Sequence, residues 1–573
     1  MTKALQSYDY IVFTLYSLII ASYGFWIYKR KQLATANSTD FFLAEGQLTW
    51  WAIGASLIAS NISAEQFIGM SGNGFRLGLA ISAYVWISAV SLVLVGVFFM
   101  PVYLKNRIYT MPQFLKTRYN ETVAMIMAIF WLFLYIFVNL TSILYLGAIA
   151  INNLTGGAHF HLIMIGLALF ALFITLGGMK VIGYTDVIQV FVLVAGGLIT
   201  CYMALKLVAE KLDAPGVLAS LPLLRSEASD HFHMIFARGD KFYNELPGIA
   251  VLVGGLWINN LNYWGCNQYI TQRALGADLD TARKGILFAG FLKLLMPIIV
   301  MLPGIAAYVL HKNGHLEGLR GMDDAYSAIL GFLPSGLKGL AIAALTAAIV
   351  ASLAGKLNSI GTIFTLDIYL KYFRKKPAAD KDISSTAEIA NAHREGEEKN
   401  MVWVGRMAAL VSIVLAVIFE WKDMLGISGE GGFTFIQKYT GFISPGVFAM
   451  FILGFFWKKT TSNAALFATI GGFILSIIFK FMPAFVDLSF LNPIGFAVPN
   501  ADGVFEIPFI DRMGFVFLIC VIGMYFISIY ETKKGVQTNG LEVDTKMFKM
   551  APSFMVGALI ILSVLATLYT VFW

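Results

Sequence analysis

Apolar runs of about 20 residues recur along almost the whole chain and leave it few possible folds. A helix needs about 20 apolar residues to cross the hydrocarbon core of a bilayer, where it satisfies its own backbone hydrogen bonds. The runs therefore predict an all-α, multi-pass membrane protein with about 14 spans. We place these spans at 8–28, 50–75, 79–103, 121–151, 161–180, 184–208, 247–270, 284–310, 328–370, 402–420, 431–457, 463–482, 512–531 and 552–572.

Composition supports this class. Of the 573 residues, 58% are hydrophobic and 13% are charged, whereas soluble domains carry about twice that share of charge. The three cysteines, Cys201, Cys266 and Cys520, lie in apolar runs and predict neither a disulfide framework nor a metal site. We find no phosphate-binding glycine loop and no nucleophile–base pattern, so the sequence does not predict an enzyme.

Basic residues are concentrated in alternate loops, which predicts the orientation of the chain. Lys29–Lys31, Arg374–Lys376 and Lys533–Lys534 lie in such loops, whereas the 483–511 loop has neither lysine nor arginine. Because loops rich in Lys and Arg stay in the cytoplasm, we expect both termini outside and the protein in the inner (plasma) membrane. The net charge of +7 is then a topology signal and not a sign of nucleic-acid binding.

The stretch Trp50–Gly74 is long enough to span a bilayer, but its middle is polar. Asn61, Ser63, Glu65 and Gln66 lie at the depth where a spanning helix should be apolar. A charged side chain at that depth costs roughly 2.5–3.5 kcal/mol. One interpretation is a broken helix whose free backbone groups and side chains bind an ion and a solute. The other is that these groups only form hydrogen bonds between helices.

A second stretch, Pro247–Ile270, has the same character, because Gly254 and Gly255 precede a polar and aromatic patch at 259–264. The stretch opens a second group of five expected spans, the seventh to eleventh, and the first stretch opens the second to sixth. Five is odd, so the second group enters the membrane upside down relative to the first. Interrupted helices at matching places in two inverted halves are typical of a secondary transporter.

This layout divides the chain into five parts. We expect an N-terminal extra helix and cytoplasmic loop at 1–49, a first repeat at 50–208, an external loop at 209–246, a second repeat at 247–459 with a charged cytoplasmic connector at 374–400, and C-terminal flanking helices at 460–573. Three further polar residues lie within expected spans: Asn139, Lys293 and Gln437. The two amides suit contacts between helices, whereas a lysine flanked by leucines needs a partner or a polar cavity.

Many blocks of the chain, in order, resemble the sodium:solute symporter family, and most closely its bacterial sodium/galactose (sodium/glucose-type) branch. They include GASLIASNISAEQFIGMSG, YIFVNLTSILYLG, TDVIQV, YWGCNQYITQR, LNSIGTIFTLDIY and YTGFISPG. The resemblance covers nearly the whole chain. It implies a five-plus-five inverted-repeat core of the leucine-transporter type, with a broken first helix in each repeat. It also implies sodium-driven import of a sugar or polyol by alternating access.

The resemblance also implies roles for individual residues. Sodium would bind to backbone carbonyls of Ala59, Ile62 and Ala348 and to the Ser352 hydroxyl. The solute would bind to Gln66, Ser88, Asn139, Asn260, Lys293 and Gln437, with Tyr263 stacking on the sugar and closing the inner gate and Trp264 beside it. Met70, Tyr84 and Phe433 would form the outer gate. Asp186 would lie on the sodium exit path, or it would instead cap a helix that begins after Thr185.

Three residues depart from the family pattern. Val85 replaces a sugar-binding glutamate, which puts galactose itself in doubt, and Ala351 replaces a second sodium-binding serine. Lys356 lies one helical turn from Ser352, where its ammonium could pair with Glu65 or partly substitute for sodium. The surviving sodium ligands favour the structural pair. We therefore predict a sodium-coupled sugar symporter, with weakened or non-sodium coupling, an uncoupled facilitator or a sensor as alternatives; the oligomeric state stays open.

Overall fold

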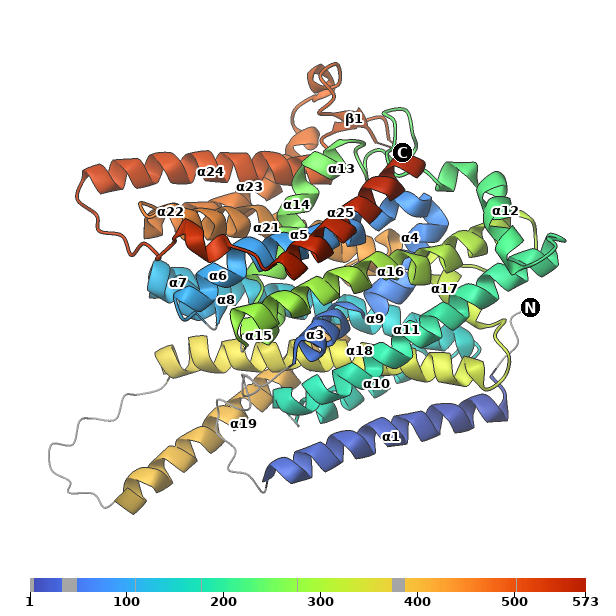
Figure 1. Cartoon of the computed structure of the whole chain (residues 1–573), viewed down its shortest axis with the longest axis horizontal. Coiled ribbons are helices and arrows are strands. Elements are labelled where there is room, and N and C mark those ends of the chain that lie inside the picture. Colours follow the sequence, from blue (N-terminus) through green and yellow to red (C-terminus); the bar gives the residue numbers. More distant parts are fainter. Residues whose placement is uncertain are drawn as a thin grey trace.

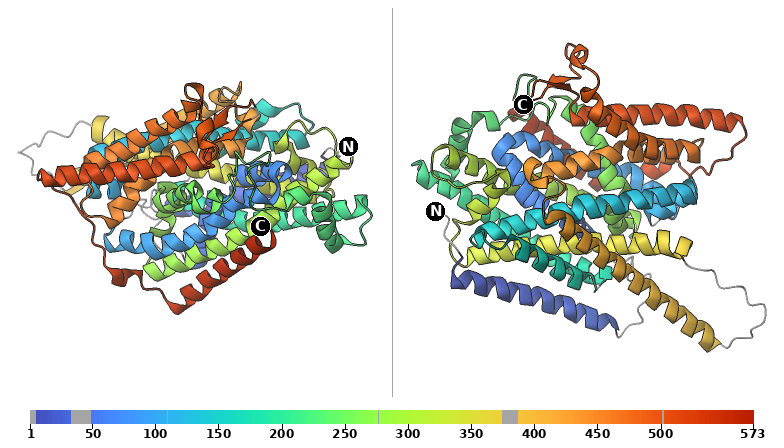
Figure 2. Two further views of the ribbon diagram at one scale, coloured as in Figure 1. Left: turned by 90° about the horizontal axis from the view of Figure 1, so that it is seen from above. Right: turned by 180° about the vertical axis from the view of Figure 1, so that it is seen from behind.

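The computed structural model describes residues 5–32, 49–108, 110–176, 178–275, 277–373, 387–500 and 502–573. These residues form a bundle in which most long helices run side by side along one direction (Figures 1 and 2). Eleven helical segments in this described part are long and apolar enough to cross a membrane: Ser7–Trp26, Glu65–Lys105, Glu121–Leu154, Val187–Lys211, Leu279–Lys312, Leu337–Phe373, Asn400–Glu420, Gly432–Phe456, Ser462–Ala484, Phe509–Lys533 and Pro552–Val571. The chain is thus an all-helical, multi-pass membrane protein.

Three of the expected spans have no counterpart among these eleven segments, namely 50–75, 161–180 and 247–270. The second of them is occupied by α10 (Phe160–Thr175), an apolar helix of 16 residues. The other two are interrupted, so neither is one continuous long helix. Length and hydropathy therefore identify the unbroken spans, and the exceptions include the two stretches whose polar middles predicted a break.

The first interruption lies between α3 (Trp50–Asn61) and the π-helical turn η2 (Glu65–Gly69). We call the intervening residues 62–64 the first break. Ile62 is extended there, with φ −81° and ψ 109°. The Ser63 carbonyl then accepts from the backbone N–H groups of Gln66 and Phe67 at 3.1 and 3.2 Å, which starts the next helical segment. The chain continues through α4 (Met70–Leu77).

The glycines of this first stretch do not lie at the break, but they let helices pack closely. A Cβ on Gly69 would lie 2.7 Å from the Cβ of Phe433, on α21 (Gly432–Phe456). Because a contact that short is sterically excluded, the glycine is what allows η2 to approach α21. In the first stretch the break therefore coincides with the polar residues, and the glycines serve packing.

The second stretch is interrupted twice. A short α13 (Ala250–Val253) ends at Gly254, the second break, and α14 (Gly255–Cys266) follows. Asn267 is extended, with φ −99° and ψ 121°, and this third break precedes α15 (Gln268–Leu275). The sequence indicated the second break but not the third. A Cβ on Gly255 would overlap the Ile510 carbonyl, so α14 packs directly on α24 (Phe509–Lys533).

Two long helices enclose α3. It packs against α16 (Leu279–Lys312) and against α18 (Leu337–Ile363), which continues as the π-helical segment η9 (Phe364–Phe373). α11 (Gly178–Lys211) also contacts all three of these helices. The expected span 328–370 was wrong at its start, because α17 (Ala325–Leu330) is separate and α18 begins at Leu337 after a turn.

The first described helix begins, and the last one finishes, towards the same end of the bundle. In Figure 1, α1 (Ser7–Gln32) starts and α25 (Pro552–Val571) finishes towards the right, whereas α18 and α24 finish towards the left. A small antiparallel hairpin, β1 (Val498–Pro499) and β2 (Phe505–Glu506), precedes α24 and pairs Val498 with Glu506. Among the described residues the rest of the regular structure is helical.

Candidate functional site

A cavity lies where the interrupted segments meet, and we call it the central cavity. Its volume is about 80 Å³. Its walls come from the end of α3, η2, the start of α4, α5 (Ala83–Leu94), the π-helical η5 (Leu134–Leu140), α14, α16 and α21. All but one of the residues predicted to bind the solute line it: Gln66, Ser88, Asn139, Asn260, Tyr263, Lys293 and Gln437. Glu65, Met70, Tyr84, Val85 and Phe433 line it as well.

Trp264 is the predicted solute residue that does not line the central cavity. It is buried behind Tyr263, and the two rings meet edge to face with centroids 5.2 Å apart. The Lys293 ammonium lies 5.4 Å from the centroid of the Trp264 ring, within range of a cation–π interaction. Trp264 therefore supports two lining residues from outside the cavity.

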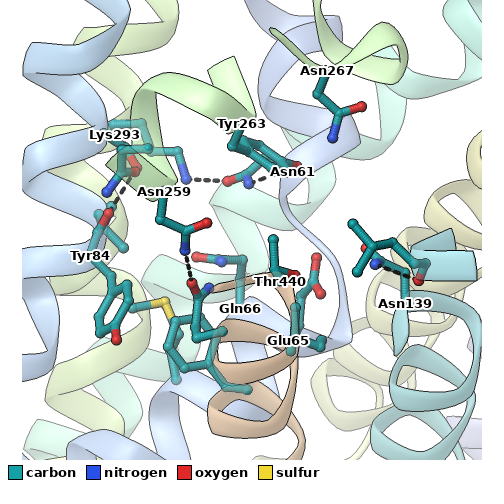
Figure 3. A pocket seen from close by; sticks show the side chains of 18 of the residues that line it. Asn61, Glu65, Gln66, Tyr84, Asn139, Asn259, Tyr263, Asn267, Lys293 and Thr440 are labelled. Atoms are coloured by element: carbon teal, nitrogen blue, oxygen red, sulfur yellow. Dashed lines mark hydrogen bonds between the residues drawn. The ribbon is translucent and has the colours of Figure 1, made fainter. Parts of the chain in front are cut away.

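A chain of hydrogen bonds joins three elements around the first break (Figure 3). Lys293 on α16 donates to Oδ1 of Asn61, the last residue of α3. The amide nitrogen of Asn61 in turn donates to the Tyr263 hydroxyl on α14 at 3.2 Å. A buried ammonium needs such partners, because an uncompensated charge there is costly. The end of α3 is thereby held to α16 and to α14.

A second set of hydrogen bonds joins α14 to α21. The Asn259 amide donates to Oε1 of Gln437 at 2.6 Å, and its Oδ1 accepts from the Ser444 hydroxyl at 3.1 Å. Asn262 donates to the same hydroxyl oxygen at 3.1 Å. Gln437 is therefore one member of a hydrogen-bond network that borders the cavity. Asn259 and Asn262, from the polar patch at 259–264, provide the α14 side of this network.

Two further lining residues differ in how their polar groups are satisfied. The Ser88 hydroxyl on α5 donates to Oδ1 of Asn260, whose amide nitrogen donates to the Leu256 carbonyl at 3.0 Å. The Oε1 atom of Gln66 is buried and has no hydrogen-bond partner within the described residues. Unsatisfied buried acceptors are rare, because each costs about 1–3 kcal/mol. Gln66 thus offers a bound molecule an acceptor that no described residue uses.

The central cavity is closed on one side and more open on the other. Met70, Tyr84 and Phe433 are buried, and the Tyr84 and Phe433 rings meet edge to face with centroids 5.4 Å apart. On the opposite side, the lining residues Asn139, Tyr263, Asn267, Gln437 and Thr440 are each partly exposed. Access is therefore from the side of Asn267, where α14 ends.

The predicted sodium ligands lie on two helices that pack together. Ala59 precedes the first break on α3, Ile62 is the extended residue within it, and Ala348 and Ser352 are buried on α18. Residues that leave a helix free carbonyl oxygens from the helical hydrogen-bond ladder, and such carbonyls suit sodium. Ala351, which replaces the second sodium-binding serine of the family, adds no side-chain oxygen.

Lys356 occupies the space between these two helices. Its ammonium donates to the Ser352 hydroxyl at 3.2 Å and lies 3.9 Å from Oε1 of Glu65, the first residue after the break. The Lys356 side chain is 2% exposed and that of Glu65 is 9% exposed. The predicted pair of Lys356 and Glu65 is therefore present. The same ammonium also contacts the Ser352 hydroxyl, which was predicted to bind sodium.

Asp186 lies in the third turn of α11, which begins at Gly178, and its side chain is outside the described part of the structure. The alternative interpretation, a cap on a helix starting after Thr185, is wrong because the helix is already formed there.

Several lining residues were not assigned from the sequence: Asn61, Tyr135, Asn259, Asn267 and Thr440. The Tyr135 hydroxyl on η5 donates to Oδ1 of Asn267 at 2.5 Å across the open side. Asn61 and Asn259 were visible as polar residues within expected spans. Asn267 follows Cys266 in an otherwise helical run, and nothing in that run indicated the third break.

Comparisons with known proteins identify the family of the chain. The model of the "Sodium:solute symporter family" matches residues 41–472. The sodium/glucose cotransporter of Vibrio parahaemolyticus is 42% identical over 99% of this chain and 98% of its own length. The sodium/myo-inositol cotransporter 2 of Homo sapiens is 31% identical over 83% of this chain and 70% of its own.

A solved structure shares the fold. The substrate-bound, outward-open structure of a Na⁺-coupled sialic acid symporter aligns with a TM-score of 0.72 at 19% identity, covering 92% of this chain and 98% of that one. The matched family model covers most of the chain, and the Vibrio relative covers nearly all of it. The chain therefore belongs to the sodium:solute symporter family and is a transporter, not an enzyme, as its sequence predicted.

Proposed function

We propose that the protein is a sodium-coupled symporter that imports a sugar or a related polyol. The observation that carries the proposal is the central cavity, which gathers amides, hydroxyls and a tyrosine ring beside a broken helix. The names of the two relatives, a sodium/glucose and a sodium/myo-inositol cotransporter, support a polyhydroxylated solute. Sodium would then be a co-substrate of the reaction and not a resident cofactor.

Solute recognition would rest on the polar wall of the cavity. Gln66 offers a free acceptor, Asn260 and Gln437 bring amides from α14 and α21, and Tyr263 offers a ring face for a sugar. Val85 lines the same wall without a polar group. A site that lacks a hydrogen-bond partner for one hydroxyl binds less strongly to solutes that require it. We therefore expect galactose to bind more weakly than solutes that place no hydroxyl group against Val85.

Sodium would brace α3 against α18. The carbonyls of Ala59, Ile62 and Ala348 and the Ser352 hydroxyl would be its ligands, and Asp186 would lie on its exit path. Broken helices in transporters bind sodium in this way through free carbonyl oxygens. Coupling requires that sodium bind one conformation more tightly than the other. Holding the first break in place would preform the wall that contains Gln66.

The conformation suggests where the structure lies in a transport cycle. We propose fourteen spans, a five-plus-five core made of the 50–208 and 247–459 repeats, and both termini outside in the inner membrane. Met70, Tyr84 and Phe433 would then be a closed outer gate, and the partly exposed side at Tyr263 and Asn267 would face the cytoplasm. Rocking of one repeat against the rest would reverse this access.

Solute uptake into proteoliposomes tests the proposal. An inward sodium gradient with a membrane potential of 100 mV, negative inside, should drive accumulation of labelled glucose or myo-inositol. One sodium ion moving through that potential supplies about 2.3 kcal/mol, enough for roughly 50-fold accumulation before any concentration gradient is added. Unlabelled galactose, other polyols and sialic acid, added as competitors, would rank the solutes.

Potassium replaces sodium in the matched control at the same potential, and accumulation should then be lost. Equilibration without accumulation, with or without sodium, would instead identify an uncoupled facilitator. Binding of solute with no uptake under any gradient would favour a sensor. Either result would overturn sodium-coupled symport.

A further inference from the structure

Lys356 is a buried lysine within a long apolar helix. It lies on α18, one turn after Ser352 and on the same helix face, and its side chain is 2% exposed. A lysine ammonium is a compact point charge with three donors and no acceptor, so in a buried place it must find oxygen atoms. It finds them at the packing surface between α18 and the first break.

The oxygen atoms around Lys356 come from the two elements that a sodium ion would join. Ser352 Oγ, at 3.2 Å, belongs to α18, and Glu65 Oε1, at 3.9 Å, belongs to η2 immediately after the break. A sodium ion at the proposed ligands would need the same Ser352 oxygen. Without any bound ion, the ammonium thus supplies a positive charge and connects α18 to the residue that follows the first break.

Ala351, next to Ser352, leaves a sodium ion with fewer oxygen ligands on α18. Ala351 provides no hydroxyl, so the side-chain oxygens offered by α18 at this level reduce to Ser352, which Lys356 already contacts. Two cations at a separation of a few ångströms repel each other strongly in a buried site. Sodium and the Lys356 ammonium therefore cannot share the Ser352 hydroxyl.

We infer that Lys356 is a tethered cation that competes with sodium for Ser352 and the first break, so that sodium binds only when the ammonium withdraws towards Glu65. This inference rests on the proposed sodium site and deepens the proposed function. It has two consequences. The protein binds sodium more weakly than it would without Lys356, and the solute site stays partly preformed when sodium is absent.

Equilibrium binding of radioactive sodium to the purified protein tests the competition without requiring transport. Lys356→Met removes the ammonium and keeps the length of the side chain, so we expect sodium to bind about tenfold more tightly or better than in the unmodified protein. The matched control is Lys338→Met, which removes another buried lysine near the start of the same helix, remote from Glu65. Its sodium affinity should not change.

A second comparison keeps the inference testable if Lys356→Met folds poorly with Glu65 left unpaired. Glu65→Gln combined with Lys356→Met has no uncompensated carboxylate, and it should bind sodium about tenfold more tightly than Glu65→Gln alone. Equal or weaker sodium binding in both comparisons would show that Lys356 is only a structural partner of Glu65.

The outcomes also separate this inference from the proposed function. If the unmodified protein accumulates no solute under a sodium gradient but Lys356→Met binds sodium more tightly, the symport proposal fails and the competition stands. If the unmodified protein accumulates solute and neither Lys356 variant changes sodium affinity, symport stands and the competition fails.

Discussion

Replacing Gln66 by alanine should abolish solute uptake while the protein still reaches the membrane in normal amounts. Gln66 lines the central cavity, and its Oε1 has no hydrogen-bond partner in the described part of the chain. Removing the side chain takes away hydrogen bonds to the solute and breaks none that Oε1 makes within the protein. We expect a loss of at least about 100-fold in uptake rate at low solute concentration, which corresponds to roughly 3 kcal/mol.

The matched control for Gln66 is Gln537→Ala, which removes an exposed glutamine outside the helical spans. It should transport normally. Uptake measured with radiolabelled solute, normalised to the amount of protein in the membrane, checks both variants. Normal uptake by Gln66→Ala would move the solute site away from the central cavity. Asn260→Ala should fail in the same way, because it also removes the partner of the Ser88 hydroxyl.

Replacing Lys293 by methionine should lower uptake by about 10- to 100-fold, in line with the loss of one hydrogen bond to a charged group. Lys293 donates to Asn61, and Asn61 donates to Tyr263, so the change acts on the end of α3 and on the ring proposed to stack on the solute. Lys284→Met on the same helix is the control, because Lys284 is exposed and pairs with Asp280.

A double-mutant cycle shows whether this chain of contacts acts as a unit. If Lys293 works through Asn61, the loss caused by Lys293→Met should be much smaller in a Tyr263→Phe background, because the chain is already cut at its far end. Strictly additive losses would mean that Lys293 acts on the solute by itself. Initial rates of uptake at several solute concentrations provide the measurement.

Much of the fold was predictable from the residues because lipid imposes simple requirements. Runs such as Pro552–Val571 must be apolar and long, so the unbroken spans can be located directly from the sequence. The start of α18 was misplaced because the apolar residues 328–333 were joined to the following helix across Pro334, Ser335 and Gly336. Hydropathy cannot detect the turn at Gly336, where φ is 88°.

The two broken stretches show which helix breaks can be predicted from polar residues and glycines. Asn61, Ser63 and Glu65 predicted an interruption, and it lies among them. The Ser63 hydroxyl accepts from the backbone N–H of Glu65 at 3.4 Å, which replaces a bond of the helical ladder. Gly254 coincides with a break in the second stretch, whereas Gly69 in the first stretch serves packing against Phe433. A glycine in a membrane helix has both uses, and only the neighbouring helix decides between them.

The candidate site was only partly predictable, because its contacts join residues far apart in the chain. The amide of Asn61 meets the hydroxyl of Tyr263 across 202 positions, and Asn259 meets Gln437 across 178. The family resemblance identified Gln66, Asn260 and Lys293 as lining residues. It could not show that Lys356 contacts Ser352, because that lysine departs from the family pattern.

The central claim is that the sodium ligands on α3 and α18 and the solute-binding residues of the central cavity bind their ligands in a linked way. The most direct test is equilibrium binding of each ligand to the purified protein, with and without the other. Because linkage is reciprocal, sodium should tighten solute binding by the same factor by which the solute tightens sodium binding, and we expect a factor of about 5–100. A solute affinity that does not change between sodium and potassium would contradict the account.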